Sequence, residues 1–218
     1  MQVANARLEF IINGSGSDAG LVGLTFAVRE LASAQHLLQR RGLRVYLAGS
    51  DREEAGHLHI ATDSTHGVPI SLVQRTRGTP ASVSERDDAV SGLDHVVIRT
   101  CDPERAVALY AGRLGLSLRL DRSEPSWGAR LLFFRCGDLI IELAHDLKAG
   151  VGEAPDKLWG LSWRVPDIAA AHARLRNGGI DVSEIRSGRR AGSKVFSVRS
   201  HNAGVPTLMI GPDNRSAA

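Results

Sequence analysis

Two stretches decide the fold: Gly92-Leu93-Asp94-His95-Val96-Val97-Ile98-Arg99 and Leu139-Ile140-Ile141-Glu142-Leu143. Both are short apolar runs rich in Val and Ile, which is typical of buried strands. Between them the sequence predicts an amphipathic helix over residues 102–113 and two further strands. The whole stretch therefore reads as one βαβββ module, with a histidine on its first strand and a glutamate on its last.

The same order of elements occurs three times along the chain. The first module is predicted over residues 23–73, the second over 95–143 and the third over 160–210. The tripeptide Gly-Val-Pro recurs just before the last strand in the first and third modules, at residues 67–69 and 204–206. Each helix is followed by a glycine that can end it, namely Gly42, Gly115 and Gly178.

Residue types also mark the ends of the elements. Asp102 followed by Pro103, and likewise Asp167, are expected to cap the second and third helices. In the third module the second strand is predicted over residues 182–185 and the next over 194–199.

The two-residue period of a strand assigns the faces of the sheet. His95, Val97 and Arg99 share one face of the first strand, and Glu142 points away from the apolar side chains beside it. We therefore predict that His95 and Glu142 lie together on the open, concave face.

The bulk composition excludes several classes of protein. The chain has 218 residues, 43% of them hydrophobic, and a net charge of only +3 without a basic run interleaved with aromatics. This disfavours a nucleic-acid partner. The apolar runs are too short to span a bilayer, so no membrane association is expected. Cys101 and Cys136 form no paired motif and the N-terminus does not resemble a signal peptide, which favours the cytoplasm.

The motif around Asp94-His95, the helix after Asp102-Pro103 and the Ile-Ile-Glu-Leu strand resemble the vicinal oxygen chelate superfamily, which includes glyoxalases, extradiol dioxygenases and bleomycin resistance proteins. The resemblance implies an α+β fold in which βαβββ modules pair into cupped mixed sheets with helices on the outer face. It also implies a divalent metal such as Zn, Ni, Fe or Mn in the cup, with His95 and Glu142 as ligands and Glu142 as the catalytic carboxylate. The expected ligand is a small oxygenated, anionic molecule, and the expected reaction is that of a lyase or dioxygenase.

The third module departs from the family pattern. Gly160 stands where its first-strand ligand is expected, and Leu208, or Met209 under a one-residue shift, stands at the carboxylate position. The first module has Gly23 and Ser71 at these two places. One histidine and one glutamate are an incomplete metal shell. Two alternatives therefore stay open: a metal-free binding protein of the bleomycin resistance type, and a truncated product with an incomplete site.

The start of the chain suggests a fourth module. Leu8-Glu9-Phe10-Ile11 aligns with residues 141–144, so Glu9 corresponds to Glu142 and is a further candidate metal ligand. The chain would then begin in the last strand of a module whose earlier part is absent, either naturally or through loss of an N-terminal segment.

This alignment sets the predicted domains. Residues 1–77 hold the remnant strand and the first module, residues 78–91 are a polar linker, and residues 92–218 form a complete two-module domain. Because the first module lacks a partner, its open face and strand edge predict a homodimer.

Two arginines and a tryptophan are candidates for substrate binding. Arg99 and Arg164 occupy matching places on the first strands of the second and third modules, and Trp163 is the neighbour of Arg164. Converging arginines would bind an anion through paired hydrogen bonds. The alternatives are that both arginines reach solvent and that the tryptophan packs in the core. Several other histidines could supply a third metal ligand: His57, His59, His66, His145 and His201.

Overall fold

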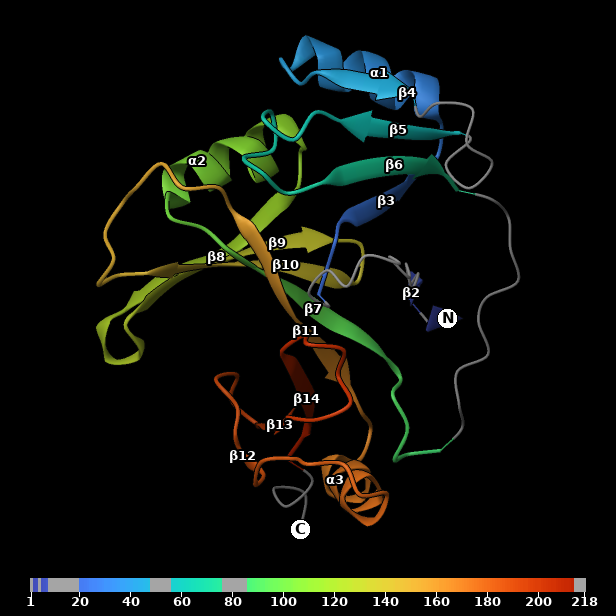
Figure 1. Cartoon of the computed structure of the whole chain (residues 1–218), viewed down its shortest axis with the longest axis vertical. Helices are drawn as coiled ribbons and strands as arrows, with labels where there is room; N and C mark the ends of the chain where they lie inside the picture. The colour runs from blue at the N-terminus through green and yellow to red at the C-terminus, as the bar shows by residue number, and fades with distance from the viewer. Residues whose placement is uncertain (1, 4, 8–19, 48–55, 76–85, 214–218) are drawn as a thin grey trace.

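One strand order occurs three times within the residues that the computed structural model describes, 2–3, 5–7, 20–47, 56–75 and 86–213 (Figure 1). In each module the first strand pairs in parallel with the last, and the two middle strands follow outward in antiparallel fashion. The predicted repeat of βαβββ modules is therefore confirmed.

The first module forms a separate four-stranded sheet of order β3-β6-β5-β4. Its elements are β3 (Leu24–Val28), α1 (Leu31–Arg40), β4 (Val45–Leu47), β5 (His57–Ile60) and β6 (Ile70–Gln74). Before it, β1 (Gln2–Val3) and β2 (Ala6–Arg7) make a short hairpin.

The second and third modules share one eight-stranded sheet of order β12-β13-β14-β11-β7-β10-β9-β8. The second module contains β7 (Gly92–Arg99), α2 (Pro103–Val107), the π-helix η1 (Ala108–Arg113), β8 (Ser117–Glu124), the 3-10 turn η2 (Pro125–Trp127), β9 (Ala129–Cys136) and β10 (Leu139–Asp146). The third contains β11 (Lys157–Arg164), α3 (Ile168–Asn177), β12 (Arg186–Ser187), β13 (Ser193–Val198) and β14 (Thr207–Pro212). The first strands β7 and β11 run antiparallel at the centre, so the two modules meet edge to edge.

The predicted helix starts are confirmed. The Asp102 carboxylate accepts a hydrogen bond from the Arg105 backbone N–H at 3.0 Å. The Asp167 carboxylate accepts hydrogen bonds from two backbone N–H groups in the first turn of α3. One boundary was wrong: the strand predicted over residues 182–185 is not formed, and β12 begins only at Arg186. Val182 instead makes an isolated bridge and packs against the core of the third module, so its apolar pattern reflects burial rather than a ladder.

Two apolar cores hold the modules. The larger core joins the first module to the outer face of the second, because Leu58 and Ile70 pack in the same cluster as Ile98, Leu109 and Tyr110. The smaller core lies between α3 and the strands of the third module. Helices thus cover the outer face of the eight-stranded sheet on both sides of its centre, which leaves the concave face for a site.

Polar contacts fasten the first module to the second. The backbone N–H of Asp156, just before β11, donates to the His66 carbonyl at 2.8 Å, and Arg41 donates to the Arg113 carbonyl at 3.0 Å. The domain boundaries at residues 77 and 91 stay predictions. Among the described helices, none is both long and apolar enough to cross a bilayer.

Candidate active site

A cavity of about 1310 Å³ opens on the concave face of the eight-stranded sheet. Its walls come from the second and third modules, and its apolar lining includes Val97, Phe133, Ile140, Leu161 and Leu208. For Val97, Phe133 and Ile140 the neighbours along the strand pack in the larger core, as expected for a sheet with two distinct faces.

His95 and Glu142 meet on the wall of this cavity. Glu142 lies opposite Val97 in the parallel pairing of β7 and β10, which places it two residues along the same face from His95. The His95 Nε2 and Glu142 Oε2 atoms are 3.2 Å apart. Glu142 is only 7% exposed, and burial raises the pKa of its carboxyl, against the opposing effects of His95 and Arg189. The pair can therefore hold a proton between its two members.

Asp94 orients the imidazole, although a regular pleat would place it on the outer face. In the pairing of β7 with β11, His95 is opposite Ser162 and Leu93 is opposite Trp163, so Asp94 is skipped. This β-bulge turns two consecutive side chains toward the cavity. The Asp94 Oδ2 atom lies 2.9 Å from His95 Nδ1.

This contact assigns the nitrogens of the imidazole. Burial opposes ionisation of Asp94, but the hydrogen bond from His95 and the charges of His95, Arg190 and Arg164 outweigh it and lower the pKa of the carboxyl. Because an ionised carboxylate only accepts hydrogen bonds, Nδ1 of His95 carries the hydrogen and Nε2 faces Glu142.

Ser162 completes the polar cluster. Its hydroxyl is buried and lies 2.7 Å from His95 Nε2, from the strand opposite. Neither Ser162 nor Asp94 was identified from the sequence as a site residue. Ser162 is brought opposite His95 by the register of the two first strands, which no pattern along either strand indicates.

The donor set does not fit a divalent metal. The register places Gly160 and Leu208 where a second histidine and carboxylate are expected, and Leu208, not Met209, faces the cavity. A Cβ atom at Gly160 would lie 2.7 Å from the Pro206 carbonyl oxygen, so a histidine cannot stand there without a backbone shift. Among the described residues no group of three or more His, Cys, Asp or Glu could hold a metal ion. Glu9 lies outside the described residues.

The three expected substrate-binding residues lie in different places. Arg99 lines the cavity and its guanidinium carbon is 4.3 Å from the ring centre of Trp159. Arg164 is not among the lining residues; it donates to the Leu93 carbonyl at 2.8 Å and pairs with Asp138 at 3.1 Å. The two arginines therefore do not converge as predicted, because the Arg164 side chain is bonded to Leu93 and Asp138 outside the cavity.

Trp163 lies in the core of the third module. It is 8% exposed and packs in the same cluster as Leu93 and Phe196, on the face away from the cavity. It lies opposite Leu93 in the pairing of the first strands, and the two residues share a face. On β11 the tryptophan that reaches the cavity is Trp159, which precedes Gly160 and is skipped in the same pairing.

Cations are concentrated around the cavity. Six lining residues carry a positive charge, against three acidic ones. The cations are Arg99, Lys148, Lys157, Arg186, Arg189 and Arg190; the acids are Asp94, Glu142 and Asp146. An apolar interior with a cationic rim suits an anion that carries an apolar body.

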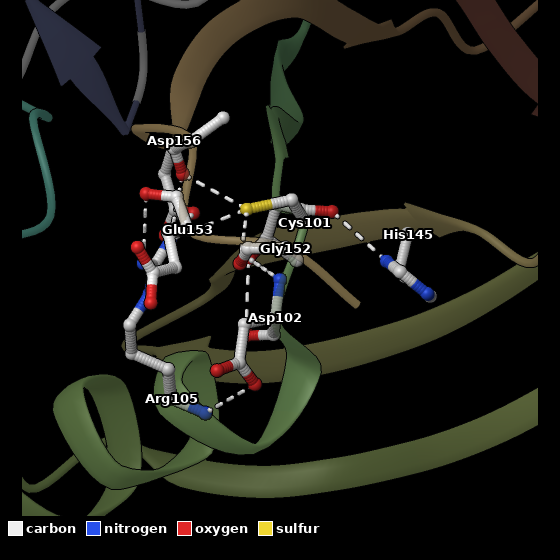
Figure 2. Close-up of polar contacts among 9 residues, drawn as sticks. Cys101, Asp102, Arg105, His145, Gly152, Glu153 and Asp156 are labelled. Atoms are coloured by element: carbon white, nitrogen blue, oxygen red, sulfur yellow. Dashed lines mark hydrogen bonds and ion pairs between the residues drawn. The ribbon is translucent and has the colours of Figure 1, made fainter. Parts of the chain in front are cut away.

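A polar cluster around Cys101 braces one wall of the cavity (Figure 2). The Cys101 thiol donates to the carbonyls of Gly152 and Ala154, each at 2.9 Å, and Arg105 reaches both the Ala154 carbonyl and the buried Asp156 carboxylate. The contacts tie the segment before β11 to the start of α2. We assign this cluster a structural role, since the thiol of Cys101 and the Nη2 atom of Arg105 bond within it.

Comparison with known proteins agrees with this geometry. Residues 94–196 match the family described as the glyoxalase/bleomycin resistance protein/dioxygenase superfamily. The two modules that build the cavity are therefore similar in sequence to that superfamily. The matched range contains the bulge at Asp94, the His95 and Glu142 pair and the cationic turn after β12, so the resemblance seen in the sequence is confirmed for the two modules that build the cavity.

Individual proteins are also similar to the chain. An ethylmalonyl-CoA/methylmalonyl-CoA epimerase of Cereibacter sphaeroides is 29% identical over 130 residues, which are 56% of this chain and 90% of that protein. A crystal structure of methylmalonyl-CoA epimerase from Mycobacterium tuberculosis has 25% identity and a TM-score of 0.49, covering 65% of this chain and 97% of that one. A methylmalonyl-CoA epimerase in complex with methylmalonyl-CoA and NH4+ has 18% identity and a TM-score of 0.48, covering 58% and 97%.

Proposed function

We propose that the chain is a proton-transfer enzyme that binds a small acyl anion in the cup and exchanges the hydrogen on the carbon next to its carbonyl. The observation that carries the proposal is the buried Glu142 carboxylate, 3.2 Å from His95 Nε2, on the wall of a cavity with a cationic rim. Similarity to an epimerase of acyl-CoA substrates supports the same class of reaction.

The pair provides the base that such a reaction needs. Ionised Glu142 takes the proton, so an O–H bond forms on the carboxyl while the carbon–hydrogen electrons remain on the ligand as an enolate. The proton on Glu142 exchanges with one from water, and transfer of this solvent-derived proton to the enolate carbon regenerates the acyl compound with its hydrogen exchanged. A raised pKa makes the carboxylate a stronger base, and Asp94 keeps Nε2 of His95 turned toward it. A protonated His95 beside Glu142 would stabilise the enolate charge.

No step of this proposal passes through a divalent metal. Two protein donors are fewer than catalytic sites for zinc and similar ions use, and the third module offers no side-chain donor at Gly160 or Leu208. The glyoxalase and dioxygenase reactions expected from the family resemblance depend on such a metal.

Hydrogen exchange tests the proposal directly. The purified protein, with chelator present, is incubated with methylmalonyl-CoA in deuterated buffer, and loss of the α-hydrogen is followed by NMR against a protein-free control. We expect catalysed exchange, reduced about 1000-fold in Glu142→Gln, since general bases contribute about 10²–10⁴ in rate. The exposed Glu153→Gln serves as the matched control and should keep full activity.

The contrary results are clear. Exchange that appears only after a divalent ion is added, or that survives in Glu142→Gln, would sink the metal-free mechanism. Absence of exchange with every acyl thioester tried would reject the enzyme.

A second candidate function is metal-free binding of a small molecule without turnover. The apolar lining and the exposed Trp127 and Trp159 at the cavity favour it. Ligand-induced thermal stabilisation that ignores chelator, without hydrogen exchange, would support this candidate over the enzyme.

Two further expectations remain part of the proposal. We propose a cytoplasmic location, which the unpaired Cys101 and Cys136 support. We also propose a homodimer through the first module. One face of its sheet carries His59 and Ser71, and the exposed ring of Tyr46 stacks on the ring of His59 there. A monomer in light scattering at micromolar concentration would count against the dimer.

A further inference from the structure

The guanidinium of Arg189 lies at the mouth of the cavity between Trp127 and Glu142. Its carbon is 4.8 Å from the centre of the Trp127 ring, and its Nη1 atom is 4.0 Å from Glu142 Oε1. Arg189 belongs to the turn between β12 and β13, whereas Trp127 ends η2 between β8 and β9. The contact therefore joins the two lips of the cavity, one from each module.

Arg122 on the same indole provides a contrast. Its guanidinium carbon is 5.0 Å from the Trp127 ring, and its Nη2 atom donates to Glu124 at 2.8 Å. Arg189 makes no hydrogen bond to any described residue, and its one acidic neighbour, Glu142, is at the outer limit of an ion pair. With 56% of its side chain exposed, Arg189 has N–H donors free for a ligand in the cavity.

We infer that Arg189 binds a carboxylate of the ligand and makes the cavity selective for acids over their neutral counterparts. The inference rests on the proposed function only in placing the ligand in the cup. A planar guanidinium donates two parallel hydrogen bonds to a carboxylate. Stacking on Trp127 holds the guanidinium in one orientation and so reduces the entropy lost on binding.

The position also relates recognition to chemistry. A carboxylate held by Arg189 would lie beside the base, because Arg189 Nη1 and Glu142 Oε1 are 4.0 Å apart. The reactive carbon would then be the one that bears the carboxylate. Ligands with a carboxylate far from the acidic carbon would fit less well.

Anion binding tests the inference without any turnover. Malonate, neutral malonamide and inorganic phosphate are titrated into the wild-type chain, Arg189→Gln and Arg122→Gln, with binding followed by calorimetry. We expect malonate to bind the wild type, to bind Arg189→Gln about tenfold more weakly, and to bind Arg122→Gln within about twofold. Malonamide should bind weakly and equally to all three.

Three results would overturn the inference. Absence of malonate binding would do so, as would equal losses in the two arginine variants, because a general positive field would then explain the affinity. Phosphate binding as tightly as malonate would overturn the selectivity for carboxylates. Arg189→Lys, which keeps the charge but loses the planar fork, should recover less than half of the lost binding free energy. Malonate binding through Arg189 without hydrogen exchange would leave this inference standing and reject the proposed enzyme.

Discussion

The second and third modules use the same backbone device with different side chains. In the pairing of their first strands, β7 skips Asp94 and β11 skips Trp159. Each bulge turns two consecutive residues toward the cavity, an acid with His95 in one module and an indole with Gly160 in the other. Equivalent bulges therefore supply reactive groups on one side and ligand contacts on the other.

The last strands continue the contrast. Glu142 in the second module corresponds to Leu208 in the third, and both line the cavity. Gly160 lies against Pro206, and Gly23 in the first module lies against Pro69 in the same way. In both modules the close approach of the proline therefore leaves little room for a side chain at the position of the glycine.

The largest expected effect tests what the Asp94 bulge contributes. Asp94→Asn removes the carboxylate that fixes the His95 tautomer, so the hydrogen-exchange rate should fall about 100-fold. NMR with the labelled acyl thioester measures it, and an altered pH profile would separate a change in the imidazole from loss of folding. Asp146→Asn is the control, because Asp146 also lines the cavity but its carboxylate accepts a hydrogen bond from the Lys148 backbone N–H and not from His95. Equal rates in both variants would remove Asp94 from the mechanism.

The next largest effect tests the glycine of the third module. Gly160→Ala forces a Cβ to within 2.7 Å of the Pro206 carbonyl oxygen, and we expect a loss of about 1–3 kcal/mol in the free energy of unfolding. Gly23→Ala meets Pro69 at 3.2 Å and should cost less, while Gly112→Ala has nothing within 4 Å and should be neutral or better. Urea titration measures all three. A harmless Gly160→Ala would show that the position is open and would reopen the question of a metal ligand there.

The sequence was enough to predict the modules, their strand order and the shared face of His95 and Glu142. These depend on local periodicity and on repetition, which a single chain displays. Asp94 and Ser162 were missed because the bulge and the opposing strand arise from pairing between modules, and no period along one strand reports it. The same limit explains why the prediction for Arg164 failed. The alternation along its strand suggested that it faces the cavity, but its side chain bonds to Leu93 and Asp138 instead.

The smallest effect concerns the two neighbouring acids of the second module, whose pKa values move in opposite directions. Burial raises the pKa of Glu142 above 4.5, so the stability it contributes is present below pH 4.5 and is lost as the pH rises through the folded value. The pKa of Asp94 is lowered below 3.8, against its burial, mainly by the hydrogen bond from His95. Its contribution is therefore present above pH 3.8 and is lost as the pH falls through the folded value.

The two substitutions should consequently change stability at pH 7 in opposite senses. For each variant we compare the change in free energy of unfolding, relative to the wild type, at pH 7 and at pH 4. This change should be more favourable at pH 7 than at pH 4 for Glu142→Gln and less favourable at pH 7 for Asp94→Asn. Chemical unfolding at the two pH values measures both, with Glu153→Gln as an exposed control that should follow the wild type. Parallel changes in the two variants would mean that the acids titrate as one unit with His95, and the separate roles given to them would have to be merged. Opposite changes would show that the second module keeps a buried, destabilising base next to a stabilising acid. The third module has Trp159 and Leu208 in the corresponding places and carries neither charge.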